Sequence, residues 1–188
     1  MKSLVMGRDY IERRDNLLTK QECTDIIQWV YNNKNLIPDT NEYSGYDYCD
    51  LMDTGQDCMK VLSPPPLKPL YESIVKLKNY YQKNNPEIER LDWWDIDYIR
   101  FKAWKPGEFY HKWHSEHGIN TPFRILSFLI YLSDNDCCTE FRNYKNVPTK
   151  AGRGIMFPAY FTHEHRGSPC KKGLDRFIVS GYFSFTHG

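Results

Sequence analysis

WHSEHG at residues 113–118 and THEHRGSP at residues 162–169 are the two stretches around which the chain is organised. The first offers His114 and Glu116, two residues apart, and the second offers His165. Residues i and i+2 of a β-strand face the same way, so a strand over the first stretch would aim His114 and Glu116 at one point. With His165 arriving from another strand, two imidazoles and a carboxylate would share one face of an ion, which suits non-haem ferrous iron.

The length and composition predict one globular domain. The 188 residues are 40% hydrophobic and 15% aromatic, which is enough for one core. The net charge of +1 and the lack of a basic block give no indication of a nucleic-acid partner. We find no apolar run of membrane-spanning length and no signal peptide, and therefore expect no membrane association and a cytoplasmic location.

The six cysteines match no zinc template in their spacing. For an intracellular chain we expect all six to be free thiols. The adjacent Cys137 and Cys138 are interpreted as small buried hydrophobes.

The first half of the chain predicts two helices separated by a polar segment. Thr19 and Glu22 form a capping box that begins a helix ending near residue 33, and a second helix is expected over 67–84. The stretch 38–63 is polar and rich in turn residues. Two interpretations of it stay open: a surface loop with one or two edge strands, or a lid over the site.

The second half of the chain changes to a strand pattern. Apolar or alternating runs bounded by turns occupy 99–103, 124–132, 153–158 and 176–185. Two helices followed by many short strands predict an α+β fold, with a sandwich or barrel backed by helices.

Four stretches resemble, in order, the motifs of prolyl 4-hydroxylase-like 2-oxoglutarate/iron oxygenases. They are WKPGEFYHKWHSEHG (104–118), RILSFLIYLSDND (124–136), CCTEF (137–141) and AGRGIMFPAYFTHEHRGSPCKKGLDRF (151–177). The resemblance covers residues 98–185. It implies a double-stranded β-helix, or jelly roll, with supporting N-terminal helices. We accordingly expect one domain over 1–188, with helical support and a lid loop in 1–92 and the jelly-roll core in 93–188.

The same resemblance implies the ligands and the co-substrate. His114, Glu116 and His165 would hold Fe(II), and 2-oxoglutarate would take other positions on the metal. Arg176, at the start of the last strand, would pair with the far carboxylate of 2-oxoglutarate, since a guanidinium matches a carboxylate in a bidentate pair. Tyr131 stands at the position whose phenol binds the same carboxylate. Ascorbate is a candidate reductant.

Several assignments have rivals. His163 could replace His165 as the distal ligand, although the offsets of Pro169 and Gly173 favour His165. Arg166 could take the role of Arg176. Two positions depart from the family pattern: Glu116 stands where the family has Asp, and Trp104 stands where relatives often have a tyrosine that binds the co-substrate.

The function implied by the resemblance is that of a 2-oxoglutarate- and Fe(II)-dependent dioxygenase that hydroxylates a substrate C–H bond. Peptidyl proline is the best single expectation, with molecular oxygen as the other reactant and an extended peptide or protein chain as the partner. Two alternatives stay open: an iron oxygenase acting on a nucleobase or small metabolite, and a non-catalytic jelly-roll binding module.

Overall fold

The computed structural model describes residues 8–91, 94–170 and 173–186. Most of the chain lies in β-strands, and the helices belong to the first half. The helices are α1 (Lys20–Asn33), α2 (Cys58–Val61) and α3 (Lys68–Asn84), with the 3-10 turns η1 (Pro86–Arg90) and η2 (Phe161–His163). The strands are β1 (Glu12–Arg14), β2 (Ile37–Pro38), β3 (Asp47–Met52), β4 (Trp94–Trp104), β5 (Arg124–Tyr131), β6 (Cys138–Phe141), β7 (Val147–Pro148), β8 (Gly154–Pro158), β9 (His165–Gly167) and β10 (Arg176–Phe185).

Two antiparallel sheets make up the β-structure. The larger has the strand order β1-β8-β5-β10-β4-β3-β2, and the smaller has the order β7-β6-β9. The long strands β4 and β10 lie side by side, with Arg176 opposite Trp104 and Ile178 opposite Lys102. The last strand therefore runs between β4 and β5, and its first residues reach the end of the sheet at which β4 finishes.

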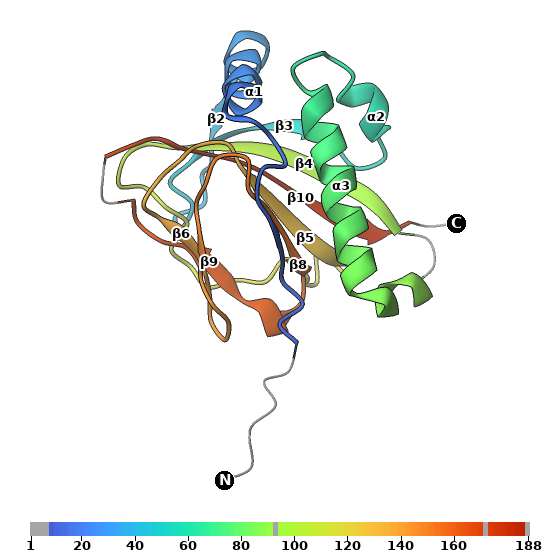
Figure 1. The fold of residues 1–188 in the computed structure, drawn as a ribbon. Coiled ribbons are helices and arrows are strands. Elements are labelled where there is room, and N and C mark those ends of the chain that lie inside the picture. The colour runs from blue at the N-terminus through green and yellow to red at the C-terminus, as the bar shows by residue number, and fades with distance from the viewer. Residues whose placement is uncertain (1–7, 92–93, 171–172, 187–188) are drawn as a thin grey trace.

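Both long helices form where the sequence predicts them. Thr19 caps α1 in a reciprocal capping box with Glu22. In α3, a proline at the first turn and a stripe of apolar residues at helical spacing bury one face. The buried stripe comprises Leu70, Ile74, Leu77 and Tyr81. Figure 1 shows α1 and α3 on the same side of the larger sheet, with β6 and β9 away from them.

Successive side chains of β4 point to opposite faces of the larger sheet, and each face contributes to a different hydrophobic core. Ile99, Phe101 and Ala103 of β4 belong to a cluster that includes the buried faces of α1 and α3. The even-numbered Trp104 belongs to a second cluster, which joins the larger sheet to Phe141 of β6. One face of the larger sheet thus packs on helices and the other on the smaller sheet, which is the jelly-roll arrangement that the sequence predicts.

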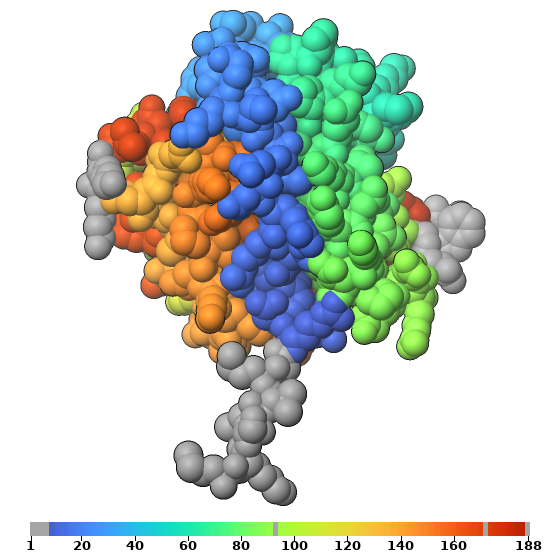
Figure 2. Space-filling view, in the orientation of Figure 1, coloured from blue at the N-terminus to red at the C-terminus, as the bar shows by residue number. Residues whose placement is uncertain are grey.

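The N-terminal segment is part of the sheet. Strand β1 pairs with β8, so that Glu12 lies opposite Met156. Figure 2 shows this segment, in blue, lying between α3 and later parts of the chain coloured orange. Strand β1 is therefore an edge strand of the larger sheet.

The polar stretch 38–63 also contributes strands. Strand β3 pairs with β4 and β2 pairs with β3, so two strands form this edge of the sheet as one interpretation expected. Asp39, Asn41 and Tyr46 from the same stretch line the central cavity. The stretch therefore combines an edge of the sheet with part of a cavity wall.

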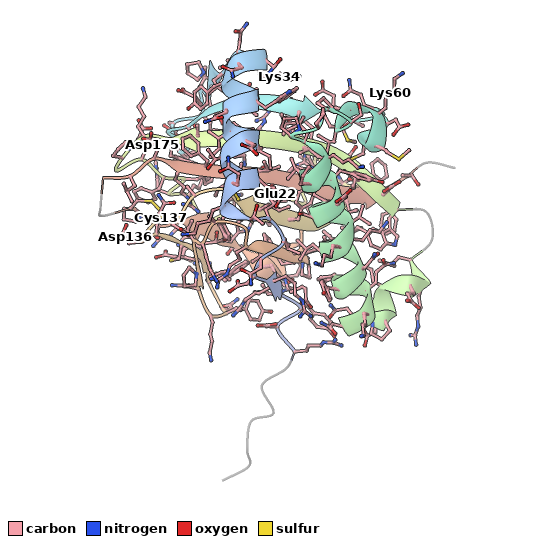
Figure 3. All side chains as sticks on the ribbon, turned by 45° about the horizontal axis from the view of Figure 1, so that its top comes forward. Glu22, Lys34, Lys60, Asp136, Cys137 and Asp175 are labelled. Carbon is pink, nitrogen blue, oxygen red and sulfur yellow. A yellow bond between two sulfur atoms is a disulfide. The ribbon has the colours of Figure 1, made fainter. Side chains whose placement is uncertain are left out.

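The expectation of six free thiols is wrong for one pair. Cys137 and Cys170 form a disulfide, with their Cα atoms 4.6 Å apart. Residues 33 apart in the sequence meet because the segment after β9 returns along β6, where Ser168 donates its backbone N–H to the carbonyl of Cys138. In Figure 3, Cys137 and Asp136 lie on the same side of the molecule as Asp175. Cys138 is a half-buried free thiol.

No helix among the described residues combines the length and the apolar character required to cross a membrane. The two long helices are instead amphipathic, with their apolar faces on the sheet.

Candidate active site

Three predicted ligand residues meet at one point. Nε2 of His114 lies 3.4 Å from Oε1 of Glu116, and Nε2 of His165 lies 3.8 Å from the same oxygen. One donor atom from each residue lies within 4.8 Å of the other two. Both histidines and the carboxylate therefore face a common point at which a single metal ion could bind.

The backbone that brings them together is not the strand expected over 113–118. His114 forms an isolated antiparallel bridge with His165, through one backbone hydrogen bond in each direction. Beyond it the chain turns, and the backbone N–H groups of Glu116 and His117 both donate to the carbonyl of Ala159. The predicted strand is wrong, but the bridge and the shared carbonyl bring the same side chains to one side.

Hydrogen bonds indicate which nitrogen of each histidine is free. Nδ1 of His114 lies 3.0 Å from the carbonyl of Lys112, and Nδ1 of His165 lies 3.1 Å from the carbonyl of His163. A carbonyl only accepts, so each neutral ring carries its proton on Nδ1 and presents the lone pair of Nε2. Burial and, to a smaller extent, the neighbouring His114 lower the pKa of His165 to about 3, which keeps the ring neutral.

Glu116 is held as a carboxylate. Burial by itself raises its pKa, but the neighbouring side chains of His114, then His165 and Lys102, bring the pKa well below its ordinary value. Its other oxygen, Oε2, lies 3.6 Å from Nη1 of Arg124. The guanidinium of Arg124 in turn lies over the ring of Tyr182, 3.6 Å from its centre. One oxygen of Glu116 is thus directed at the two imidazoles and the other at Arg124.

The rival ligand His163 lies elsewhere. It belongs to η2 rather than to the strand of His165, and its Nε2 lies 2.9 Å from the carbonyl of Asp9. Its ring stacks on Tyr144 with centres 4.8 Å apart. His163 is a buried packing residue that joins η2 to the N-terminal segment, and it does not belong to the cluster of donor atoms formed by His114, Glu116 and His165.

A cavity of about 330 Å³ opens beside the three ligands. Its wall includes the even-numbered residues of β4 and β10, which share one face of the sheet. These residues are Tyr98, Arg100, Lys102, Trp104, Arg176, Ile178 and Tyr182. The volume matches that of sites for small ligands.

Arg176 lies at one end of this wall and is 3% exposed. Its Nε and Nη1 atoms are buried and have no hydrogen-bond partner among the described residues. Burial lowers its pKa, since a guanidinium without a partner is costly to desolvate. The alternative, Arg166, donates from Nε to Oε2 of Glu140 at 2.7 Å and already has a partner. A buried guanidinium with unused donors fits a carboxylate group of a bound molecule.

Tyr131 does not line the cavity itself but contacts a residue that does. Its hydroxyl is 2.7 Å from that of Thr139, and it is Thr139 that lines the cavity. Burial raises the pKa of Tyr131 to about 12, so the phenol keeps its proton. Trp104 does line the cavity beside Arg176, but its indole N–H donates to the carbonyl of Ser44.

Sequence reasoning overlooked three polar residues on this wall. Lys102, Arg124 and Tyr182 all line the cavity. Lys102 is half-buried, and burial lowers its pKa. The signal was present: Lys102 alternates with the core residues Phe101 and Ala103, so it faces the opposite side of β4, where the second sheet packs.

Comparisons with known proteins identify the class. Residues 99–184 match the family model described as the 2OG-Fe(II) oxygenase superfamily. This part of the chain is a 2-oxoglutarate/Fe(II) oxygenase domain, and the protein is a 2-oxoglutarate-dependent oxygenase that uses Fe(II) and 2-oxoglutarate. The donor set of two imidazoles and one carboxylate and the unpaired Arg176 fit that metal and that co-substrate. The non-catalytic alternative is therefore wrong.

Solved structures agree with this assignment. The viral collagen prolyl hydroxylase of Paramecium bursaria Chlorella virus-1, in its 2OG complex, is 20% identical, with a TM-score of 0.68 over 96% of this chain and 98% of that chain. A prolyl-4-hydroxylase of Pseudomonas putida is 16% identical, with a TM-score of 0.66 over 95% and 94%. The epimerase SnoN from nogalamycin biosynthesis is 13% identical, with a TM-score of 0.66 over 95% and 78%.

At these identities the likeness establishes the double-stranded β-helix fold, which this chain shares with prolyl hydroxylases and with an epimerase alike. A search of the curated proteins finds no match. The predicted fold and class are confirmed, and the substrate has to be argued from the site itself.

Proposed function

We propose that this oxygenase hydroxylates a prolyl residue of an extended peptide. The observation that carries the proposal is the pairing, in one cavity, of a two-histidine, one-carboxylate cluster with the unpaired guanidinium of Arg176. The likeness to prolyl hydroxylases over nearly the full length of both chains supports proline as the substrate residue.

In this proposal His114, Glu116 and His165 are the metal ligands. Each imidazole offers Nε2, because its Nδ1 is bonded to a backbone carbonyl. Glu116 offers Oε1, while Arg124 holds its other oxygen.

Arg176 and Tyr131 have the co-substrate role in the same proposal. Arg176 donates to the far carboxylate of 2-oxoglutarate with the two nitrogens that are otherwise unbonded. Tyr131 acts through Thr139, whose hydroxyl it holds at the cavity wall. Tyr131 keeps its proton, so it can donate to Thr139 and leave that hydroxyl able to donate to the carboxylate.

The bound metal and 2-oxoglutarate supply the oxidation: one oxygen atom of O₂ enters the substrate C–H bond, and the other enters succinate as carbon dioxide leaves. The chain positions the reactants and excludes water. We assign positioning of the peptide to the wall formed by Asp39, Asn41 and Tyr46. In this assignment, residues 1–92 support and partly cover the jelly roll of 93–188, within one domain of 188 residues.

The test is a panel of proline-containing peptides incubated with Fe(II) and 2-oxoglutarate. Mass spectrometry should find a gain of one oxygen on proline, in equal amount to the succinate formed. The role of the stretch 38–63 is tested with Asn41→Ala, which changes an exposed position on the cavity wall. A deletion of residues 40–57 is unsuitable, because it would also remove β3 from the sheet. Oxygen on a nucleotide or free metabolite, with every peptide unmodified, would contradict the proposed substrate and leave the oxygenase class in place.

A further inference from the structure

Basic side chains outnumber acidic ones on the cavity wall. The lysine and arginine side chains that line it are Arg100, Lys102, Arg124, Arg166 and Arg176. The carboxylates that line it are Asp39 and Glu116. Charge held away from water is costly unless an opposite charge lies beside it, so the partner of each base is informative.

Two of the bases are paired outside the cavity. Nε of Arg100 lies 2.6 Å from Oδ1 of Asp50, and Nη2 of the same arginine lies 3.2 Å from Oδ2. Nε of Arg166 lies 2.7 Å from Glu140. Neither needs a charge from a ligand.

Two more of the basic side chains have a negatively charged partner when Fe(II) and 2-oxoglutarate are bound. Arg124 lies beside the second oxygen of Glu116, at 3.6 Å. Arg176 takes the far carboxylate of 2-oxoglutarate in the proposed function. These assignments account for four of the five bases.

Lys102 is the basic side chain of the cavity wall to which no partner has been assigned. It forms no ion pair with any of the described residues, and its Nζ lies 5.2 Å from the centre of the Tyr46 ring. Glu116 and Asp39 act on it electrostatically, but Glu116 is paired with Arg124, and Asp39 accepts a hydrogen bond from the hydroxyl of Tyr46. Binding of Fe(II) and 2-oxoglutarate does not neutralise it either. Fe(II), Arg124, Arg176 and Lys102 carry five positive charges, whereas Asp39, Glu116 and the two carboxylates of 2-oxoglutarate carry four negative charges, so one positive charge remains.

The position of Lys102 directs this charge toward the substrate. It lies opposite Ile178 in the β4–β10 ladder, two residue pairs along from the pair of Trp104 and Arg176 and on the same face of the sheet. Its ammonium group approaches Tyr46, which comes from the segment that we assign to the peptide. The charge is thus on the wall shared by the metal ligands and that segment.

We propose that Lys102 binds a carboxylate of the substrate, so that the enzyme selects a prolyl residue with an acidic group close to it. The inference rests on the proposed function and narrows its substrate class. The carboxylate has two possible sources: the side chain of an Asp or Glu next to the proline, or the terminal carboxylate of a chain that ends at the proline. Both present the same group to the ammonium.

Matched peptides separate the sources. One pair carries Glu or Gln beside the proline, a second pair ends at proline with a free or an amidated carboxylate, and free L-proline is added. The enzymes are the wild type, Lys102→Met, which keeps length without charge, Lys102→Arg, which restores charge, and Lys105→Met. Lys105 is exposed and does not line the cavity, so it is the control.

We expect the wild type to prefer one carboxylate peptide over its amide by about tenfold or more in kcat/KM. Lys102→Met should abolish that preference through a higher peptide KM, Lys102→Arg should restore part of it, and Lys105→Met should change nothing. The KM for 2-oxoglutarate should stay within about twofold in all four enzymes, because Arg176 rather than Lys102 holds 2-oxoglutarate in this account.

Three results would contradict either the role of Lys102 or the peptide substrate. Equal turnover of carboxylate and amide peptides would overturn the role of Lys102 while leaving prolyl hydroxylation intact. Loss of peptide-independent succinate in Lys102→Met, with a raised KM for 2-oxoglutarate, would assign Lys102 to the co-substrate and overturn the inference. Oxidation of free L-proline alone, abolished by Lys102→Met, would contradict the peptide substrate and support the carboxylate site.

Discussion

Gly167 of β9 lies against the guanidinium of Arg176. A Cβ atom at residue 167 would lie 3.0 Å from Nη1 of Arg176 and 3.3 Å from the backbone nitrogen of Tyr110. The absence of a side chain on one strand of the smaller sheet therefore leaves the space that the arginine of the larger sheet occupies. The two sheets meet here at the point at which the co-substrate carboxylate is expected.

Gly167→Ala should displace Arg176 and raise the KM for 2-oxoglutarate at least fivefold or so, since overpacking typically costs about 1–3 kcal/mol. Iron binding should change little, because the three ligands are not in contact with the new methyl group. Gly118→Ala is the control, since its Cβ would meet only Thr121 Oγ1 at 3.9 Å. Equal effects of both substitutions on the 2-oxoglutarate KM would speak against the packing argument.

Arg176→Ala should raise the 2-oxoglutarate requirement by well over tenfold. Deleting one partner of a charge-assisted pair costs roughly 2–5 kcal/mol, including the cost of leaving the other group unpaired. Arg166→Ala should have a small effect, since Arg166 is bound to Glu140. Titration of succinate formation against 2-oxoglutarate measures both, and a reversed order would move the role to Arg166.

The helices, the four long strand runs and the meeting of His114, Glu116 and His165 could be predicted, because each depends on local periodicity or on motifs of fixed order. The turn at 113–118 could not, because its geometry depends on backbone bonds to His165 and Ala159, which are distant in the sequence. The polar wall residues Lys102, Arg124 and Tyr182 were missed for a related reason. They share a wall only because β4, β5 and β10 lie side by side.

The disulfide between Cys137 and Cys170 could not be read from spacing, and it can be tested directly. Mass spectrometry after alkylation without reductant should find four modified cysteines and one intact bridge. Cys137→Ser should lower the free energy of unfolding by about 2–4 kcal/mol through the lost cross-link, measured by urea denaturation under oxidising conditions. Cys58→Ser, at a half-buried free thiol, is the comparison. The alkylation is done on protein unfolded in urea, because Cys23 and Cys49 are buried in the folded state, and six alkylated cysteines would then disprove the bridge.

Acid should weaken the contact between Asp15 and the segment before β8. Hydrogen bonds from Arg153, then Lys150, lower the pKa of Asp15 from its ordinary 3.8. Its contribution to stability is therefore present above that value and is lost as the pH falls below it. Asp15→Asn should cost less than about 1 kcal/mol at neutral pH, because the pair is partly exposed.

Urea midpoints at about pH 6 and about pH 3 measure this effect. The wild type should lose more stability between the two than Asp15→Asn does, whereas Asp53→Asn, at an exposed position without an ion pair to a described residue, should follow the wild type. Identical losses in all three proteins would show that the Asp15 pair contributes nothing to acid sensitivity.

The central claim is that His114, Glu116 and His165 bind one ferrous ion, and the iron content of two alanine variants tests it most directly. Proteins loaded anaerobically with Fe(II) and desalted should contain about one iron per chain in the wild type and in His163→Ala, and almost none in His165→Ala. His163→Ala loses its bond to Asp9 and its stacking on Tyr144, so its fold should be verified by circular dichroism. Full iron in His165→Ala, or its loss in a folded His163→Ala, would contradict the assignment.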